Sequence, residues 1–194
     1  MRWFGPLLLL PVLLAACGGG GKASSSTTTT VTTAPAALQG DATSAATGDI
    51  PDNQVFLAFH DTRAGYALKY PEGWAQRGGG DLVTFRDKNN IIRVSVLNAS
   101  APTAATVSQE IHNLAGVVNV AHPTTLQLAG GTAYRVTYQT RSAPNAVTGK
   151  RVTLIVDRYV LSHAGKIAVL DLGTPVGVDN VDAYRLIAHS FQWR

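Results

Sequence analysis

Alternation of apolar and polar side chains with a period of two residues is the feature that most constrains the fold of this chain. The clearest case is the segment 134–139, where aromatic and aliphatic residues alternate with arginine, threonine and glutamine. Segments 66–70 and 92–97 alternate in the same way. This period is typical of strands with one buried face. Segments 151–161 and 166–172 are richer in apolar residues, so we expect them in the middle of the sheet.

The connections between these segments predict tight hairpins. Asn89-Asn90, Gly130-Gly131 and Ala164-Gly165 can each adopt the positive φ angles of two-residue turns. We therefore expect a mainly antiparallel sheet. The glycine run 78–80 lacks the Gly-Lys-Ser/Thr sequence that completes a phosphate-binding loop, so we interpret it as a flexible hairpin connection.

Two segments have helical rather than strand periodicity. Thr106 and Gln109 form a capping-box pattern, and an apolar stripe follows it, with Gly116 inside the expected helix: Val107, Ile111, Leu114 and Val118. A second helix is expected to begin near Asp179, with Asp182 in its first turn and a second stripe facing the core: Val181, Tyr184, Ile187, Ala188 and Phe191. The pattern predicts an α+β fold in which helices flank a central antiparallel meander sheet.

The first residues predict export and lipid anchoring. Arg2 precedes an apolar run over 7–14, and Ala15-Ala16 lie directly before Cys17, the only cysteine of the chain. This order resembles the bacterial lipoprotein signal (lipobox), in which the cysteine is acylated. The run is too short to span a bilayer. We expect residues 1–16 to be a cleaved signal peptide, and Cys17 to hold the protein at the extracytoplasmic face of the cell membrane.

Residues 17–49 are rich in Ser, Thr, Ala and Gly, without apolar periodicity. We expect them to be a disordered tether of roughly 30 Å reach, with O-glycosylation as an alternative use of the Ser/Thr tract. The globular domain is then expected over 50–194. The formal net charge of +4 becomes +3 without Arg2, and lysines and arginines form no run of four, which argues against a nucleic-acid partner.

Motifs for catalysis or metal binding are poorly matched. The sequence holds no Gly-x-Ser-x-Gly elbow, and its histidines have no metal-ligand spacing: His60, His112, His122, His163 and His189. A folded sheet could still bring His60 and Asp61 near other groups. Asp157 and Asp171 could face each other across the 164–165 hairpin and bind a cation or share a proton. The favoured alternative pairs them with Arg158 or Lys166.

We therefore expect no catalytic, cofactor-binding or metal-ligating residues, and no cofactor. Trp74 is expected to pack in the core at a strand end, whereas Trp193, close to the C-terminus, could serve either packing or binding.

Several short motifs, in order, resemble the PsbP-type domain. They are Gly65-Tyr66-Ala67-Leu68-Lys69-Tyr70-Pro71-Glu72-Gly73-Trp74, Phe85-Arg86-Asp87, Gly130-Gly131-Thr132-Ala133-Tyr134, Thr148-Gly149-Lys150, and the closing stretch from Ala183-Tyr184 to Ser190-Phe191-Gln192-Trp193. The resemblance implies an α/β/α sandwich shared with Mog-type and LpqN-type proteins, whose members are mostly non-enzymatic. The long N-terminal arm of plant members is replaced here by the Ser/Thr tether.

Three functions follow as expectations. The leading one is an envelope lipoprotein whose domain is a non-catalytic binding or accessory module for a protein partner. The second is an extrinsic subunit or assembly factor of photosystem II. The third is an unrecognised hydrolase or small-ligand carrier that uses Asp157, Asp171 or the histidines.

Overall fold

The computed structural model describes residues 47–194. The expected signal peptide, Cys17 and most of the tether lie outside the described residues. The described elements, in chain order, are β1 (Phe56–Asp61), β2 (Tyr66–Pro71), β3 (Ala75–Gly79), β4 (Leu82–Asp87), β5 (Asn90–Asn98), α2 (Ala104–His112), β6 (Thr124–Leu128), β7 (Gly131–Arg141), β8 (Thr153–His163), β9 (Lys166–Pro175), α3 (Val181–Ser190) and β10 (Gln192–Trp193). Neither described helix has the length and hydropathy that crossing a bilayer demands.

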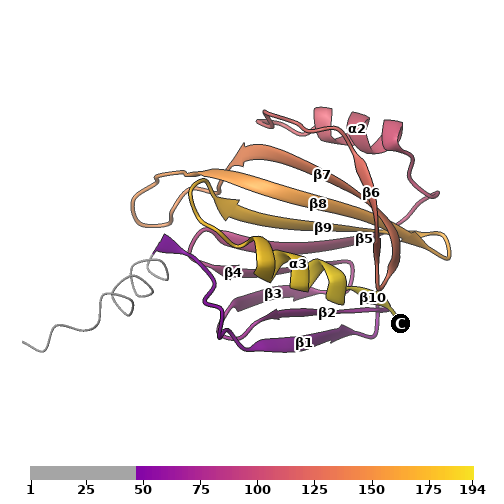
Figure 1. Cartoon of the computed structure of the whole chain (residues 1–194), viewed down its shortest axis with the longest axis horizontal. Coiled ribbons are helices and arrows are strands. Elements are labelled where there is room, and N and C mark those ends of the chain that lie inside the picture. The colour runs from indigo at the N-terminus through magenta and orange to yellow at the C-terminus, as the bar shows by residue number, and fades with distance from the viewer. Residues whose placement is uncertain (1–46) are drawn as a thin grey trace, which may run out of the picture. The chain divides into compact units, whose positions relative to one another are not determined.

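The strands form two antiparallel sheets (Figure 1). The larger has the order β3-β4-β5-β9-β8-β7-β6, and the smaller has the order β1-β2-β10. The large sheet is two meanders joined where β5 pairs with β9. The expectation of mostly antiparallel strands with two helices is confirmed, and β8 and β9 lie inside the sheet as expected. A single meander is corrected to two sheets, because β1 and β10 both pair with β2 instead of extending the large sheet.

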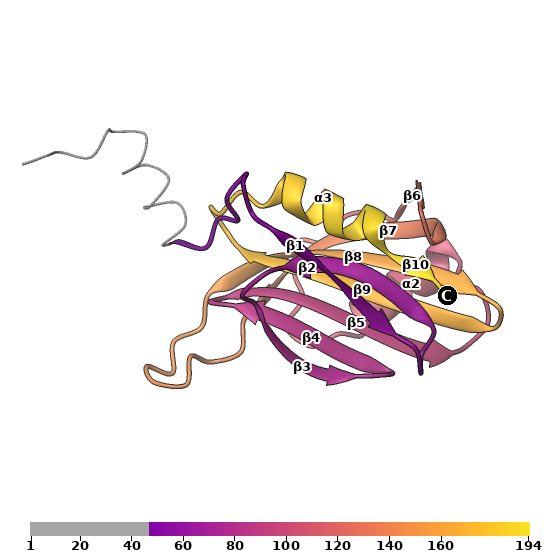
Figure 2. The ribbon, with the colours of Figure 1, turned by 90° about the horizontal axis from the view of Figure 1, so that it is seen from below.

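The two faces of the large sheet bury different partners. One face contributes Phe85, Ile92 and Leu170 to a core shared with α3 and the small sheet. The other face packs Val136 and Val156 against Val107 and Ile111 of α2 in a separate apolar cluster. Figure 2 shows α3 lying along one side of the large sheet. Each helix thus covers its own face.

The bounds of both helices differ from the sequence pattern: α2 begins and ends earlier than expected, and α3 begins later. The N-cap of α2 is Thr103, and Thr106 is the third helical residue of the capping box, instead of the cap itself. The helix ends at His112, so Gly116, with φ +72°, lies beyond it. Thr103 is the N-cap because its hydroxyl accepts from the Thr106 backbone N–H. The Thr106 hydroxyl accepts in return from the Thr103 N–H.

The core face of α3 is confirmed at four of its five expected residues. Its N-cap is Asn180, one residue after the expected start, and Tyr184, Ile187, Ala188 and Phe191 are buried. Val181 is 60% exposed, because it precedes the turn that contacts the sheet. In the first helix, Val107 and Ile111 are buried, but Val118 is exposed and bridges to Gln139 beyond the helix end.

The hairpin prediction is correct for the pairing but shifted by one residue at two turns. His163 pairs with Lys166, so Ala164 and Gly165 form the turn, with φ +46° and +77°. Asp87 pairs with Asn90, which places the β4–β5 turn at residues 88 and 89. Leu128 pairs with Gly131, which places the β6–β7 turn at 129 and 130. A one-residue shift matters because it moves a side chain to the other face of the sheet.

Asp61 ties the small sheet to the β3–β4 turn. Its carboxylate accepts from the backbone N–H of Arg63 at 3.0 Å, of Ala64 at 2.8 Å and of Gly80. The Ala64 N–H makes the largest contribution, and with the Gly80 and Arg63 N–H groups it holds the pKa of Asp61 below the ordinary value of 3.8, although burial acts in the opposite direction. Three backbone donors therefore depend on one ionised side chain.

Asp61→Asn is expected to lower the free energy of unfolding at pH 7 by about 1–3 kcal/mol, since an amide oxygen cannot replace both carboxylate oxygens. The stabilisation by ionised Asp61 is present above the unfolded-state pKa near 3.8 and is lost as pH falls through the lower folded-state pKa. Urea unfolding of wild type and variant should therefore give a constant difference above about pH 5 that shrinks below about pH 4. A difference that persists unchanged at pH 2.5 contradicts this role.

Candidate functional site

The two aspartates expected to meet across the β8–β9 hairpin do not form a carboxylate pair. Asp171 is opposite Arg158 in the ladder, whereas Asp157 is opposite Leu172 and faces the other side of the sheet. Asp157 instead accepts from Arg135 at 2.8 Å and from the Thr137 hydroxyl at 2.5 Å. The favoured pairing is thus correct for Asp171 and Arg158. It is wrong for Asp157, whose cation comes from β7.

Lys166 and His60 do not join the two aspartates in a common site. The Lys166 ammonium donates to the carbonyl oxygen of Ala64 at 3.1 Å. His60 is exposed on β1, while the neighbouring Asp61 is buried. Among residues 47–194, no three His, Cys, Asp or Glu side chains lie close enough together to hold a metal ion.

Trp74 packs in the core, as the sequence indicated, and Trp193 is partly buried. Trp74 is 9% exposed within the α3-side core. The Trp193 ring stacks on His163 at 5.9 Å and meets Phe191 edge-on at 5.5 Å. Its indole N–H is buried and has no hydrogen-bond partner among residues 47–194. Trp193 therefore closes the C-terminal end of the fold.

A buried ion pair lies on the α2 side of the large sheet. Arg158 donates to both carboxylate oxygens of Asp171, at 2.7 and 3.0 Å, and to Glu110 of α2 at 2.8 Å. Burial lowers the pKa of Arg158, but its hydrogen bonds to Asp171 and the charge of that carboxylate raise it more, so the net shift is upward. The guanidinium stays charged, and it joins α2 to the sheet.

In the described part of the chain, the same face of the sheet is largely exposed over β3, β4 and β5. The register aligns Arg77, Thr84, Arg93 and Asp171 across these strands, so the first three share the face of α2. Leu82 and Leu97 point to the same side and are 54% and 46% exposed. We call this surface the open face: Arg77, Leu82, Thr84, Arg93 and Leu97. It combines exposed cations with two exposed leucines.

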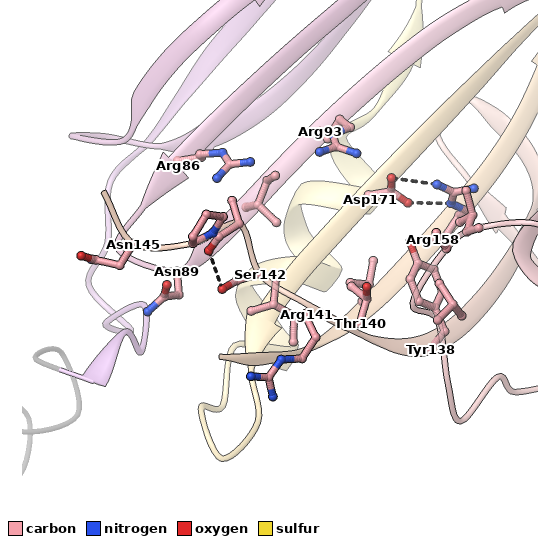
Figure 3. A pocket seen from close by; sticks show the side chains of 18 of the residues that line it. Arg86, Asn89, Arg93, Tyr138, Thr140, Arg141, Ser142, Asn145, Arg158 and Asp171 are labelled. Carbon is pink, nitrogen blue, oxygen red and sulfur yellow. Dashed lines mark hydrogen bonds and ion pairs between the residues drawn. The ribbon is translucent and has the colours of Figure 1, made fainter. Parts of the chain in front are cut away.

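Beside the open face lies a pocket of about 430 Å³ (Figure 3). Arg86 and Arg93, from β4 and β5, lie on one side, and Thr140 and Arg141 of β7 lie on the other. The Arg158–Asp171 pair is at one end, and the loop that follows β7 is at the opposite end. Ile91, Tyr138, Leu154 and Val156 add buried apolar surface to the lining. We call this site the arginine pocket.

Two cations of the arginine pocket, Arg86 and Arg93, have no carboxylate partner among residues 47–194. None of the ion pairs formed within residues 47–194 includes either of them. Arg141, by contrast, donates to Thr153 and to the carbonyl of Arg151. Burial first, and then the charges of Arg93 and Arg77, lower the pKa of Arg86. No ion pair formed within residues 47–194 therefore offsets the charges of Arg86 and Arg93.

Burial also keeps the Tyr138 phenol protonated at the floor of the pocket. Desolvation, with a further contribution from Asp171, raises the pKa of Tyr138 to about 12. Its ring lies under the Arg158 guanidinium, 5.8 Å from the ring centroid. No negative charge arises on this residue at neutral pH to offset the arginines.

This group of three arginines was not predicted from the sequence, because its members do not form a continuous run of cations. Arg77, Arg86 and Arg93 come from three strands and meet only through the sheet register. The signal was nevertheless present in the alternation. Once β4 and β5 are paired as a hairpin, Arg86 is opposite Ile91, and Arg93 is two residues further along the same face.

Comparison with known proteins identifies the fold through solved structures. No family model matches the sequence, and no curated protein matches it. The cyanobacterial PsbP (CyanoP) of Synechocystis sp. PCC 6803 aligns with a TM-score of 0.55 at 17% identity, covering 76% of this chain and 98% of that chain. This likeness confirms the expected PsbP-type domain at the level of the fold.

Two further solved structures are more distant. A protein from Bacteroides thetaiotaomicron VPI-5482 aligns with a TM-score of 0.47 at 12% identity, covering 71% of this chain and 48% of that one. LpqN of Mycobacterium tuberculosis, involved in cell envelope biogenesis, aligns with a TM-score of 0.41 at 17% identity, covering 73% of this chain and 91% of that one.

Proposed function

We propose that this chain, with its PsbP-type fold, is a lipid-anchored accessory protein of the cell envelope that docks an acidic protein partner without catalysing a reaction. The Ala15-Ala16-Cys17 sequence supports the anchor, with the acylated cysteine as the first residue of the mature chain. The Ser/Thr-rich segment then separates the domain from the bilayer. A partner would be sought within that reach, on the extracytoplasmic side.

The observation that carries the docking proposal is the composition of the open face. Arg77 and Arg93 have no carboxylate partner among residues 47–194, and Leu82 and Leu97 are exposed on the same face. Apolar residues with arginines are typical of protein interfaces, where arginine is enriched. Charge complementarity then selects a partner whose contact surface carries Asp and Glu.

The reverse face of β4 and β5 cannot serve this role, which makes the open face the available side of these strands. Phe85 and Ile92 point to the opposite side and are fully buried. Phe85 contacts Phe59 at 5.3 Å and Tyr70 at 4.2 Å between ring centroids, so the small sheet covers that side. Within residues 47–194, one side of these strands is therefore covered and the open face is exposed.

Partner capture tests the proposal with matched variants of the full chain. Leu82→Asp/Leu97→Asp and Arg77→Glu/Arg93→Glu are each expected to reduce chemical cross-linking to the partner in intact cells at least about tenfold. The control Val181→Asp/Leu186→Asp makes the same chemical change at exposed residues of α3, which packs on the other side of the sheet. Quantitative mass spectrometry of the cross-linked product gives the measurement.

The partner should also carry an acidic contact surface, and its capture after cell lysis should weaken as salt rises from about 50 to about 300 mM. Equal capture by the open-face variants and the α3 control contradicts the proposal. Failure to recover a reproducible partner with several cross-linking chemistries contradicts it as well.

A further inference from the structure

We propose that the arginine pocket binds a small organic phosphate, with the phosphate group between Arg86 and Arg93 and the organic part on the apolar floor. This inference goes beyond the docking function. The pocket is a concave site that shares Arg93 with the open face, whereas Arg86 belongs to the pocket alone. Variants of Arg86 therefore distinguish a ligand in the pocket from a partner on the open face.

The spacing of the two arginines suits one anion held by both. Arg86 is directly opposite Ile91, and Arg93 follows two residues later on β5, so the two arginines are diagonal neighbours on one face. Diagonal neighbours have Cα atoms about 7–8 Å apart, within reach of long side chains. Arg86 and Arg93 also repel each other: after burial, the charge of Arg93 is the next contribution to the lowered pKa of Arg86. An anion between them removes that repulsion.

The number of donors favours phosphate over carboxylate. Each guanidinium offers a fork of two parallel N–H groups, and one fork already occupies both oxygens of a carboxylate. A phosphate monoester has three terminal oxygens and a charge of about −1.5 to −2 at neutral pH, so it can accept from two forks and balance two cations. Arg86 and Arg93 thus match a dianion.

The floor of the pocket supplies contact for an organic group. Leu154 and Val156 are buried beneath it, and Leu114 and Val117 line the wall that follows α2. The volume of about 430 Å³ lies within the range of small-molecule sites and exceeds what a bare phosphate ion fills. Gly173 allows Ile91 and Val156 to pack closely here, because a Cβ atom at position 173 would lie 2.8 Å from Ile91 Cγ2.

The test titrates phenyl phosphate, benzoate and inorganic phosphate into the full chain in phosphatidylcholine nanodiscs, followed by isothermal titration calorimetry. Phenyl phosphate is expected to bind at one site per chain, at least about tenfold more tightly than benzoate or inorganic phosphate. Arg86→Gln and Arg93→Gln should each weaken phenyl phosphate binding at least about tenfold. Arg77→Gln is the matched control, since it removes the same charge from the same sheet face outside the pocket.

Absence of saturable binding up to 10 mM phenyl phosphate overturns the proposal. Equal weakening by Arg77→Gln and Arg86→Gln also overturns it, because that result indicates diffuse surface charge. Titration with dihexanoyl phosphatidic acid distinguishes a lipid headgroup from a soluble phosphate ester as the source of the phosphate. Binding that is tenfold tighter than phenyl phosphate supports a lipid headgroup, and similar binding supports a soluble phosphate ester. Partner capture by Arg86→Gln stays unchanged in either case, so failure here leaves the docking proposal standing.

Discussion

Asp171→Ala is expected to lower the free energy of unfolding by about 3–5 kcal/mol, the range observed when one partner of a buried ion pair is removed. The Arg158 side chain is 8% exposed, and Asp171 accepts two of its hydrogen bonds. Its remaining partner, Glu110, has a side chain that is 49% exposed and therefore compensates a buried charge poorly. Urea unfolding followed by circular dichroism measures the loss.

Two companion variants separate the buried charge from a general effect of mutation. Arg158→Met/Asp171→Leu removes both charges and is expected to be markedly more stable than Asp171→Ala, because no buried ion is left unpaired. Asp157→Ala breaks the more exposed pair with Arg135 and is expected to cost only about 1 kcal/mol. An Asp171→Ala variant within 1 kcal/mol of wild type would show that water or Glu110 already solvates Arg158.

Cys17→Ala is expected to abolish incorporation of radiolabelled palmitate. Cys17 is the only cysteine of the chain, so no second thiol can accept the acyl group. The effect is therefore all-or-none, unlike the graded effects of substitutions in the fold. The measurement is immunoprecipitation of the full chain after metabolic labelling of the source cells. Ser24→Ala, in the adjacent Ser/Thr tract, is the control and should label as wild type does.

Equal labelling of Cys17→Ala and wild type would contradict the anchor. The folded domain and the open face do not depend on this result. The envelope location does, because two or more acyl chains are what makes membrane attachment stable without a spanning helix.

The sequence predicted the strands whose two faces differ most. Segments 92–97 and 134–139 alternate clearly because one face is buried and the other meets solvent or a helix, and they became β5 and β7. β1 and β3 did not show this signal. In β1 only Asp61 is buried, and every residue of β3 is exposed. Burial therefore imposes little alternation of apolar and polar residues on these two strands. The two-residue β10 is too short to show any period.

The second sheet arises from contacts that are distant in sequence. Gln192 and Trp193 pair with Ala67 and Tyr66, about 125 residues earlier in the chain. Local periodicity holds no information about such a pairing. The pairing also explains why Phe191 is fully buried beside Tyr66, with ring centroids 5.7 Å apart. The sequence therefore predicted the position of the C-terminal aromatic residues in the fold only approximately.

In the candidate site, too, contacts between residues close in sequence were predicted, and contacts between distant residues were missed. The Arg158–Asp171 pair was anticipated because both residues flank one hairpin with a recognisable turn. The contacts of Asp157 with Arg135 and of Arg158 with Glu110 were missed, since β7 and α2 meet β8 only in the folded sheet. The arginine pocket combines residues of five strands and three connecting segments, which no single segment reveals.

Site-specific photo-cross-linking in living cells tests the docking account most directly. A photoreactive phenylalanine analogue replaces Leu97 on the open face or, as the matched control, Leu186 on α3, in the otherwise unchanged full chain. The account predicts a discrete cross-linked product from position 97, containing a protein with an acidic contact surface, and none from position 186. A partner cross-linked from position 186 and absent from position 97 would contradict the account, because it would place docking on the α3 side of the sheet.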